Sequence, residues 1–187
     1  MGRCIYDTAA TLNGFIADES NSLDWLFDVD QNGVPEEGLI STDAAVLVEG
    51  STTYEWIIEK ESVLAHPEKW RQFHGDRPTF VFTRRELAAP AGADVRFVSG
   101  AVATVLPQIE RAAGGGDIWV VGGGDLAGQF LDAGALDEIR VSIAPVALGA
   151  GAPLLPRNLG ADRLRLVSAS AYGQFARLVY AVGAFGH

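Results

Sequence analysis

The sequence predicts an α/β protein in which helices flank a central, mostly parallel sheet that ends in an antiparallel hairpin. Strand-like and helix-like segments alternate up to about residue 134, a rhythm typical of parallel strands joined by crossover helices. The rhythm then changes, because the last two strand-like runs, 163–172 and 176–185, have only a short turn between them. That spacing, across Gly173 and Gln174, favours an antiparallel hairpin. The sheet is therefore expected to be mixed, with its antiparallel part at the C-terminal edge.

The expected strands are short apolar runs bounded by glycine, proline or acidic residues, as buried strands commonly are. They lie at 3–11, 43–50, 77–87 (around TFVFT), 94–100, 117–124, 137–149, 163–172 and 176–185. No internal repeat and no linker divides the chain. We therefore expect a single domain over residues 1–187.

Helices are expected where apolar side chains recur at helical spacing behind a small or polar first residue. The segments are 51–64, 101–116 (with Pro107 inside it) and 125–134, which Gly134 closes. Residues 18–25 resemble a polar loop anchored by Trp25, and 28–42 is irregular, with room for a short helix at its end.

The amino-acid composition limits the kinds of ligand and partner that the protein is expected to bind. The formal net charge of the 187 residues is −10, which disfavours nucleic acid and anionic membranes, so an anionic ligand would need a locally basic pocket. Cys4 is the only cysteine, and His66, His74 and His187 show no metal-ligand spacing, so we expect no metal site. Without a long apolar stretch or a leader pattern near residue 1, the chain is expected to be cytoplasmic.

The turn that ends the run DIWVV is the first candidate binding feature. Residues 122–127, GGGDLA, fit the dinucleotide pattern G-x-G-x-x-A, in which backbone N–H groups approach a phosphate at a helix N-terminus. The context is not that of a Rossmann domain, because the next strand does not end in an acid. A structural corner that binds nothing is the alternative, and Asp125 could cap the helix in competition with a phosphate.

Two further turns follow predicted strands. Residues 50–53, GSTT, combine a glycine with hydroxyl side chains at another helix N-terminus, and residues 83–85, TRR, are the densest basic spot near any strand end. Ordinary N-capping and a solvated arginine pair are the alternative interpretations. Because the carboxyl ends of parallel strands meet at one edge of a sheet, the three turns can converge on one ligand. Arginines there would suit a terminal phosphate.

These turns, in this order, resemble the dihydrofolate reductase fold family, especially the branch with the reductase domain of the riboflavin-biosynthesis deaminase–reductase, the RibD C-terminal domain. ATLNGFIADESNSLDW (10–25), EGSTTYEW (49–56) and the long segment 118–155 carry the resemblance, which covers nearly the whole chain. It implies a mostly parallel sheet of about eight strands and NADPH as the hydride donor.

The resemblance also implies roles for individual residues. Ala9 and the loop with Gly14, Phe15 and Ile16 would flank the nicotinamide. Thr83, Arg84 and Arg85 would hold the adenosine ribose and its 2′-phosphate. The cradle for the pyrophosphate would comprise Gly50, Ser51, Thr52 and Thr53 together with Val121, Gly122, Gly123, Gly124, Asp125, Leu126 and Ala127.

The chain departs from the family pattern at three places. Ser51 stands where an arginine usually meets the adenosine phosphate, so a preference for NADPH over NADH would depend on Arg84 and Arg85. TLNGFIA replaces the usual S-L-D-G-basic-I-A, with Asn13 in place of the acid, which brings a phosphoribosyl substrate into question. The zinc deaminase signature is absent from the sequence, which excludes deamination by this chain.

The catalytic residues are the least defined part of the site. Trp25 would lie on the substrate side, and Asp30, five residues later, stands roughly where a folate reductase has its carboxylate. Asp24 and Asp28 compete for that role, and each could equally be a solvated loop acid. A partly buried carboxyl could deliver the proton that accompanies hydride transfer to a C=N bond.

The expected function is an NADPH-dependent reductase that acts on a C=N or C=O group of a small pyrimidine, pteridine or sugar-derived substrate. Riboflavin-pathway reduction is the first named activity and dihydrofolate reduction the second. A nucleotide-binding module of this fold without turnover remains the alternative of a different class. The apolar C-terminal strands would support a homodimer, although they could equally be core.

Overall fold

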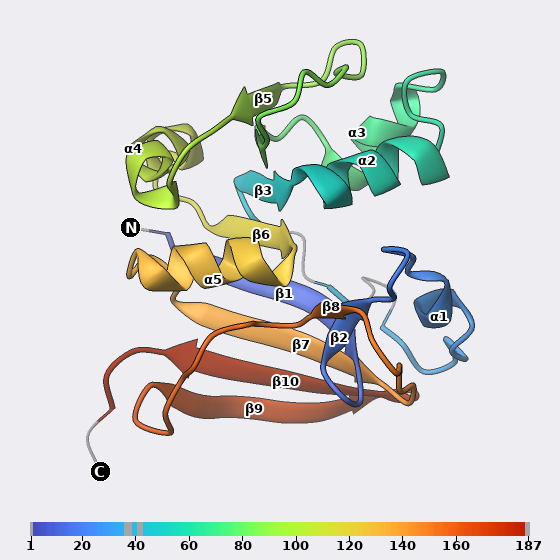
Figure 1. Ribbon diagram of the computed structural model, residues 1–187, viewed down its shortest axis with the longest axis vertical. Coiled ribbons are helices and arrows are strands. Elements are labelled where there is room, and N and C mark those ends of the chain that lie inside the picture. Colours follow the sequence, from blue (N-terminus) through green and yellow to red (C-terminus); the bar gives the residue numbers. More distant parts are fainter. Residues whose placement is uncertain (1, 36–38, 41–42, 186–187) are drawn as a thin grey trace.

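The computed structural model of the chain describes residues 2–35, 39–40 and 43–185, arranged around an eight-stranded sheet (Figure 1). The strand order is β5-β4-β3-β6-β1-β7-β10-β9. These strands are β1 (Cys4–Thr11), β3 (Val46–Gly50), β4 (Thr79–Phe82), β5 (Val95–Val98), β6 (Ile118–Gly122), β7 (Glu138–Ala144), β9 (Leu164–Tyr172) and β10 (Phe175–Val182). A separate two-stranded sheet pairs β2 (Phe15–Ala17) with β8 (Ala152–Pro153). The helices are α1 (Asp24–Phe27), α2 (Ser51–Lys60), α3 (Glu68–His74), α4 (Val102–Ala113) and α5 (Gly124–Asp132).

The predicted mixed sheet is confirmed. Neighbouring strands from β5 to β7 are all parallel, whereas β10 runs antiparallel to both β7 and β9. The hairpin between β9 and β10 turns at Gly173, whose φ of +57° suits a residue without a Cβ. The C-terminal edge of the sheet is therefore antiparallel, as the spacing of the last two apolar runs predicts.

Helices cover the two faces of the sheet unequally. Because side chains alternate along a strand, Val46 and Val48 of β3 face the main core, which α4 and α5 complete with residues such as Ile109 and Phe130. On the opposite face, Tyr54 of α2 and Trp70 of α3 pack on Val81. Helix α1 lies beyond the end of β1 (Figure 1), where its Trp25 packs against Ala9 and Ala144. Strands β1, β3, β4 and β6 are thus largely buried on both faces, as the unbroken apolar runs predict, whereas the edge strand β5 is partly exposed.

Several short elements were not predicted. Residues 24–27 form α1 where a polar loop was expected, and α3, β2 and β8 have no expected counterpart. A strand of two or three residues is too short to show a period of two, and helices of four and seven residues are too short for a clear apolar stripe. The short helix considered for the end of 28–42 falls largely on residues outside the described ranges. Within those ranges, no helix has both the length and the apolar character needed to cross a membrane.

Candidate functional site

The turns after β3 and β6 lie in contact at one edge of the sheet. Residue Glu49 of β3 is paired with Gly122 of β6, so both strands end at the same level and their helices, α2 and α5, begin side by side. A Cβ built on Gly122 would lie 3.0 Å from the Oγ1 of Thr53 in the first turn of α2. The GSTT and GGG turns are therefore adjacent parts of one candidate binding site.

The N-termini of both helices are open to a ligand. The N-caps are Gly50 for α2 and Gly123 for α5, and no described side chain makes a capping hydrogen bond at either end. The first N–H groups of an α-helix have no partner within the helix and favour an anion. Two such ends at one edge of the sheet fit a pyrophosphate.

The possibility that Asp125 caps α5 is not realised. Its carboxylate instead accepts hydrogen bonds from Gln129 (2.9 Å) and from the guanidinium of Arg157 (3.0 Å), which also bonds Asp132 (2.8 Å). The bond from Gln129 and the pairing with Arg157 lower the pKa of Asp125 below its usual range. The acid in the first turn is thus held to the side by Arg157 and leaves the end of the helix clear.

The glycines of the two turns serve different purposes. A Cβ on Gly50 would meet nothing within 4 Å, and one on Gly123 would meet only the Cδ1 of Ile16, at 4.0 Å. A Cβ on Gly124 would instead lie 2.1 Å from the carbonyl oxygen of Pro153 and 2.5 Å from that of Leu154. Gly124 is therefore required for packing, whereas the open space at Gly50 and Gly123 is available to a ligand. The Gly122–Gly123 peptide is cis.

The remaining residues of the predicted cradle are partly core. Val121 is half-buried, Leu126 and Ala127 are buried, and the last two pack into the main core beneath the sheet. The side chains of Leu126 and Ala127 are therefore not available to a ligand, and the Ala127 N–H, contrary to the prediction, already donates to the Gly123 carbonyl oxygen (3.0 Å).

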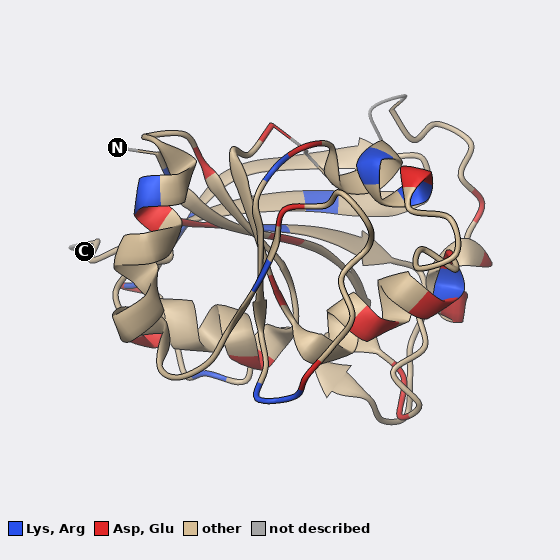
Figure 2. Cartoon of the chain, turned by 90° about the horizontal axis from the view of Figure 1, so that it is seen from above, with Lys and Arg blue, Asp and Glu red and all other residues tan. Residues whose placement is uncertain are grey.

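The third predicted turn lies next to the first, because β4 pairs with β3 and ends at the same level (Gly50 with Phe82). The Oγ1 of Thr83 accepts the N–H of Arg85 (2.9 Å), and the Arg85 side chain forms an ion pair with Glu55 of α2. Arg84 is exposed, and none of the contacts of the described residues includes its side chain. Figure 2 shows basic and acidic residues interspersed over the chain, so Arg84, whose charge has no carboxylate partner among the described residues, is the basic group of this turn that is open to an anion.

The loop after β1 approaches the same place from the other side. Ala9 is buried in β1, which lies beside β6, and Ile16 approaches Gly123 across the turn. Gly14 has a φ of +85°, a left-handed conformation that favours glycine. The structure therefore brings Ile16, one of the predicted nicotinamide residues, to the GGG turn.

The two predicted catalytic residues are not brought together. Trp25 is buried against Ala9, Ala144 and Phe175, and its Nε1 has no hydrogen-bond partner within the described chain. Asp30 is exposed and accepts the N–H of Asn32 (3.0 Å). Trp25 thus lies beside the site with a free donor, while Asp30 lies on the surface of its loop.

The other loop acids offer no better candidate. Asp24 is exposed and bonds Lys60 (3.2 Å), and Asp28 is exposed. The hydrogen bonds from Ser22 and Lys60 lower the pKa of Asp24, which does not suit it to carry a proton at neutral pH.

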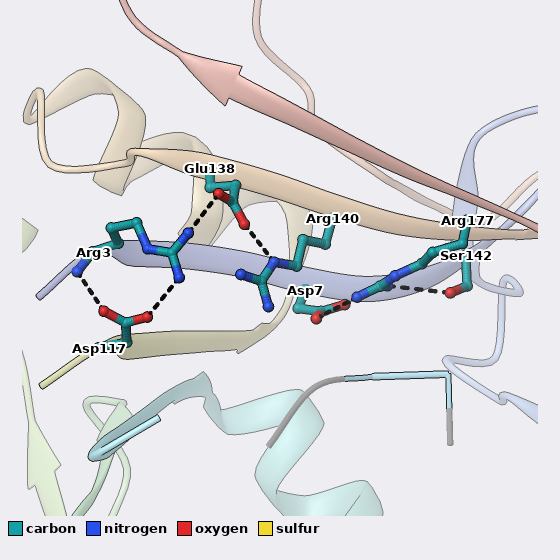
Figure 3. A network of polar contacts seen from close by, with 7 residues as sticks. All are labelled: Arg3, Asp7, Asp117, Glu138, Arg140, Ser142 and Arg177. Atoms are coloured by element: carbon teal, nitrogen blue, oxygen red, sulfur yellow. Dashed lines mark hydrogen bonds and ion pairs between the residues drawn. The ribbon is translucent and has the colours of Figure 1, made fainter. Parts of the chain in front are cut away.

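The structure reveals two buried acids that sequence reasoning missed. Glu49 is 0% exposed, neither of its carboxylate oxygens has a hydrogen-bond partner in the described chain, and burial raises its pKa to about 8. Asp7 is 1% exposed and bonds both terminal nitrogens of Arg177 at 2.7 Å, and Arg177 also donates to Ser142 (Figure 3). An acid inside an apolar strand, as in CIYDTAAT and VLVEG, is the signal that could have found both.

Comparisons with known proteins show the family and the fold of the chain. The RibD C-terminal domain family matches residues 3–176. Two proteins of Bacillus subtilis (strain 168), both described as uncharacterized, are similar in sequence. YwjB is 27% identical over 172 residues, 92% of this chain and 93% of its own. YyaP is 30% identical over 157 residues, 81% of this chain and 79% of its own.

Solved structures share the fold. A putative riboflavin biosynthesis protein from Shewanella sp. PV-4 superposes with a TM-score of 0.76 at 22% identity, covering 98% of this chain and 99% of its own. The Thermotoga maritima diaminohydroxyphosphoribosylaminopyrimidine deaminase/5-amino-6-(5-phosphoribosylamino)uracil reductase gives 0.64 at 16% identity, covering 97% of this chain and 57% of its own. The resemblance and the fold predicted from the sequence are thus confirmed, and the chain belongs to the RibD C-terminal domain family.

Proposed function

We propose that the protein is an NADPH-dependent reductase. The observation that carries this proposal is the pair of uncapped helix N-termini, α2 and α5, that meet at the carboxyl edge of β3 and β6 with open space beside Gly50 and Gly123. A dinucleotide pyrophosphate is the anion that two adjacent helix ends fit best. Membership in a family of riboflavin-pathway reductase domains supports a hydride-transfer cofactor at this place.

The residues present fit such a cofactor. Backbone N–H groups of Ser51 to Thr53 and Gly124 to Leu126 would hold the pyrophosphate, and Arg84, beside Thr83 and Arg85, would hold the 2′-phosphate. Ala9, Gly14 and Ile16 would line the nicotinamide. When bound, NADPH supplies the hydride. The chain's own part is to hold the dinucleotide in place and keep water out.

The substrate side is proposed to lie at Trp25, because this residue packs against Ala9 and its indole N–H has no hydrogen-bond partner in the part of the chain that the structure describes. A C=N or C=O group of a small pyrimidine, pteridine or sugar-derived substrate supplies the acceptor that this donor requires. A reductase of 5-amino-6-(5-phosphoribosylamino)uracil type is the first candidate, because the Thermotoga relative is described as one. Asp30 stays a prediction for the proton donor.

A two-stage experiment tests this function. Thermal unfolding with NADPH or NADH added should show a rise in Tm that is larger for NADPH. Loss of nicotinamide absorbance is then followed with 5-amino-6-(5-phosphoribosylamino)uracil and dihydrofolate as substrates. Turnover of the pyrimidine supports the first candidate, and turnover of dihydrofolate alone supports the second. A rise in Tm without turnover of either overturns the reductase proposal in favour of a nucleotide-binding module.

We also propose that the protein forms a homodimer through its C-terminal strands. Strand β9 is a sheet edge with Leu166 and Val167 exposed by 53% and 59%, and an exposed apolar edge strand usually pairs or packs with a partner. Light scattering on the purified protein tests this. A mass of one chain at micromolar concentration contradicts it, and replacing both residues by Lys should convert a dimer to a monomer.

A further inference from the structure

The side chain of Asn13 pairs with the backbone of Leu148 as one peptide group pairs with another. Its Nδ2 donates to the Leu148 carbonyl oxygen (2.6 Å), and its Oδ1 accepts the Leu148 N–H (3.1 Å). An amide is the side-chain group that offers one donor and one acceptor in this arrangement. A carboxylate at position 13, which the family pattern favours, could accept the N–H but would place a second oxygen against the carbonyl.

The pairing extends into the loop that follows β1. The Oγ1 of Thr11 donates to the Oδ1 of Asn13 (2.9 Å) and accepts the N–H of Phe15 (3.0 Å). Thr11 itself is only 1% exposed, so its hydroxyl connects the core end of β1 to the turn. The Asn13 amide, the Thr11 hydroxyl and the Phe15 N–H thus form one continuous hydrogen-bonded chain.

The same loop is attached to residues 146–154 along its length. The Leu12 N–H donates to the Val146 carbonyl (2.7 Å), and the Leu154 N–H donates to the Gly14 carbonyl (2.8 Å). Leu148 also packs against the apolar cluster that contains Trp25 and Ala9. Asn13 therefore joins the loop that carries Ile16 to Leu148, which packs on the cluster at the proposed substrate side.

We infer that Asn13 is a positioning residue that holds the 11–16 loop against the nicotinamide site through Leu148 and Thr11. Ile16, which this loop carries, approaches Gly123 at the centre of the proposed cradle. The inference rests on the proposed function, because the affected ligand is NADPH. Asn13 acts through the loop and does not itself touch the cofactor, so its loss changes how well the loop closes over the ligand.

The test compares Asn13→Ala with Asn13→Asp. The alanine variant loses both bonds to Leu148, and we expect the KM for NADPH to rise about tenfold, the effect of two exposed hydrogen bonds of modest net strength. The aspartate variant is closer in shape, yet we expect a larger rise because its second oxygen repels the Leu148 carbonyl. The Tm of the alanine variant should fall by about 3–6 °C, because a tenfold effect corresponds to about 1.4 kcal/mol. Asn32→Ala, an exposed loop asparagine outside this network, is the control.

Several results would overturn the inference. They are an unchanged KM for NADPH, a loss confined to Tm, or an aspartate variant that behaves like wild type. Amide hydrogen exchange of Phe15 and Leu148 without cofactor separates this test from that of the proposed function. Faster exchange in Asn13→Ala supports the attachment of the loop even if wild type binds no NADPH, in which case the proposed function fails. Unchanged exchange shows that the amide does not hold the loop.

Discussion

Arg85 and Glu55 form a two-bonded ion pair between the turn after β4 and helix α2. The Nη1–Oε1 distance is 2.9 Å and the Nη2–Oε2 distance is 2.5 Å. The sequence places Arg84 and Arg85 together as candidate ligands of a 2′-phosphate, but the second already has a carboxylate partner. The structure therefore separates the two neighbours into an arginine that binds the protein and one that is available to a ligand.

Replacing Arg84 by Ala should weaken NADPH binding about tenfold, the loss expected for charge-assisted hydrogen bonds to a phosphate. NADH, which lacks the 2′-phosphate, should bind as before. Isothermal titration with both cofactors measures this. Arg85→Ala is the matched control: it should reduce the affinities for the two cofactors to a similar, smaller degree, because it releases Glu55 of α2. If Arg85→Ala lost more affinity for NADPH relative to NADH than Arg84→Ala did, the 2′-phosphate would be bound by Arg85 and the proposal for Arg84 would be wrong.

Gly123→Val should abolish the binding of both cofactors in a folded protein. The added side chain has open space, with Ile16 at 4.0 Å from the Cβ, so packing is preserved while the approach of a ligand to the backbone is blocked. Circular dichroism, thermal unfolding and cofactor titration together check this. Retained affinity would mean that the GGG turn is only a structural corner.

At the next residue, Gly124→Ala should have the opposite effect and lower the stability of the protein. Its methyl group would meet two backbone oxygens, at 2.1 and 2.5 Å, so α5 must move away from residues 153–154. We expect a loss of unfolding free energy of about 2 kcal/mol or more, the range for overpacking, measured by urea denaturation. A variant as stable as wild type would contradict the packing role assigned to Gly124.

Glu49→Met should stabilise the protein increasingly as the pH rises. Burial raises the pKa of Glu49 from 4.5 to about 8, so between these values the unfolded chain has lost a proton that the folded chain keeps. Stability then falls with rising pH by up to about 1.4 kcal/mol per pH unit from this group. The methionine removes that dependence and fills a similar volume.

Urea denaturation at about pH 5, 6.5 and 8 checks the prediction, because these values span the range between the unfolded and folded pKa of Glu49. The difference between Glu49→Met and wild type should grow with each step. Glu59→Met, at an exposed position of α2, is the control and should show no such growth. A difference that stays constant with pH would show that Glu49 is ionised in the folded protein.

Removing one partner of the Asp7–Arg177 pair should be far more destabilising than removing both. Asp7→Asn leaves a buried guanidinium at 7% exposure without its carboxylate, and such a loss typically costs about 3–5 kcal/mol of unfolding free energy. The double variant Asp7→Leu/Arg177→Met replaces the pair by apolar groups and should lie closer to wild type. A double-mutant cycle with Asp7→Leu, Arg177→Met and the double variant, measured by urea denaturation, tests this, and additive losses would show that the two charges are not coupled.

Much of the fold could be predicted because its signals are local. β3 and α2 adjoin at Gly50 in the structure as in the sequence pattern, and the last two strands form the expected hairpin. A run of apolar side chains needs no distant partner to indicate burial. Elements such as α1, β2 and β8 are too short to carry such a signal, and they depend on contacts with distant segments.

The candidate site divides in the same way. The motifs of the three turns, their glycines and their arginines are visible in the sequence, and their place at strand ends predicts that they converge. Which residue serves which purpose is not visible there. In the sequence nothing distinguishes Gly123 from Gly124, and only the backbone of residues 153–154 shows that Gly124 is required for packing. Likewise, only the ion pair with Glu55 distinguishes Arg85 from Arg84.

By itself, then, the sequence determined the class of sheet, the order of its elements and the turns at which a dinucleotide is expected, because periodicity and turn chemistry are properties of neighbouring residues. Tertiary structure alone decided that Asp125 pairs with Arg157, that Asn13 is joined to Leu148, and that Glu49 is buried with no hydrogen-bond partner among the described residues. Those outcomes depend on hydrogen bonds and burial between segments far apart in the chain, and only folding brings such segments into contact.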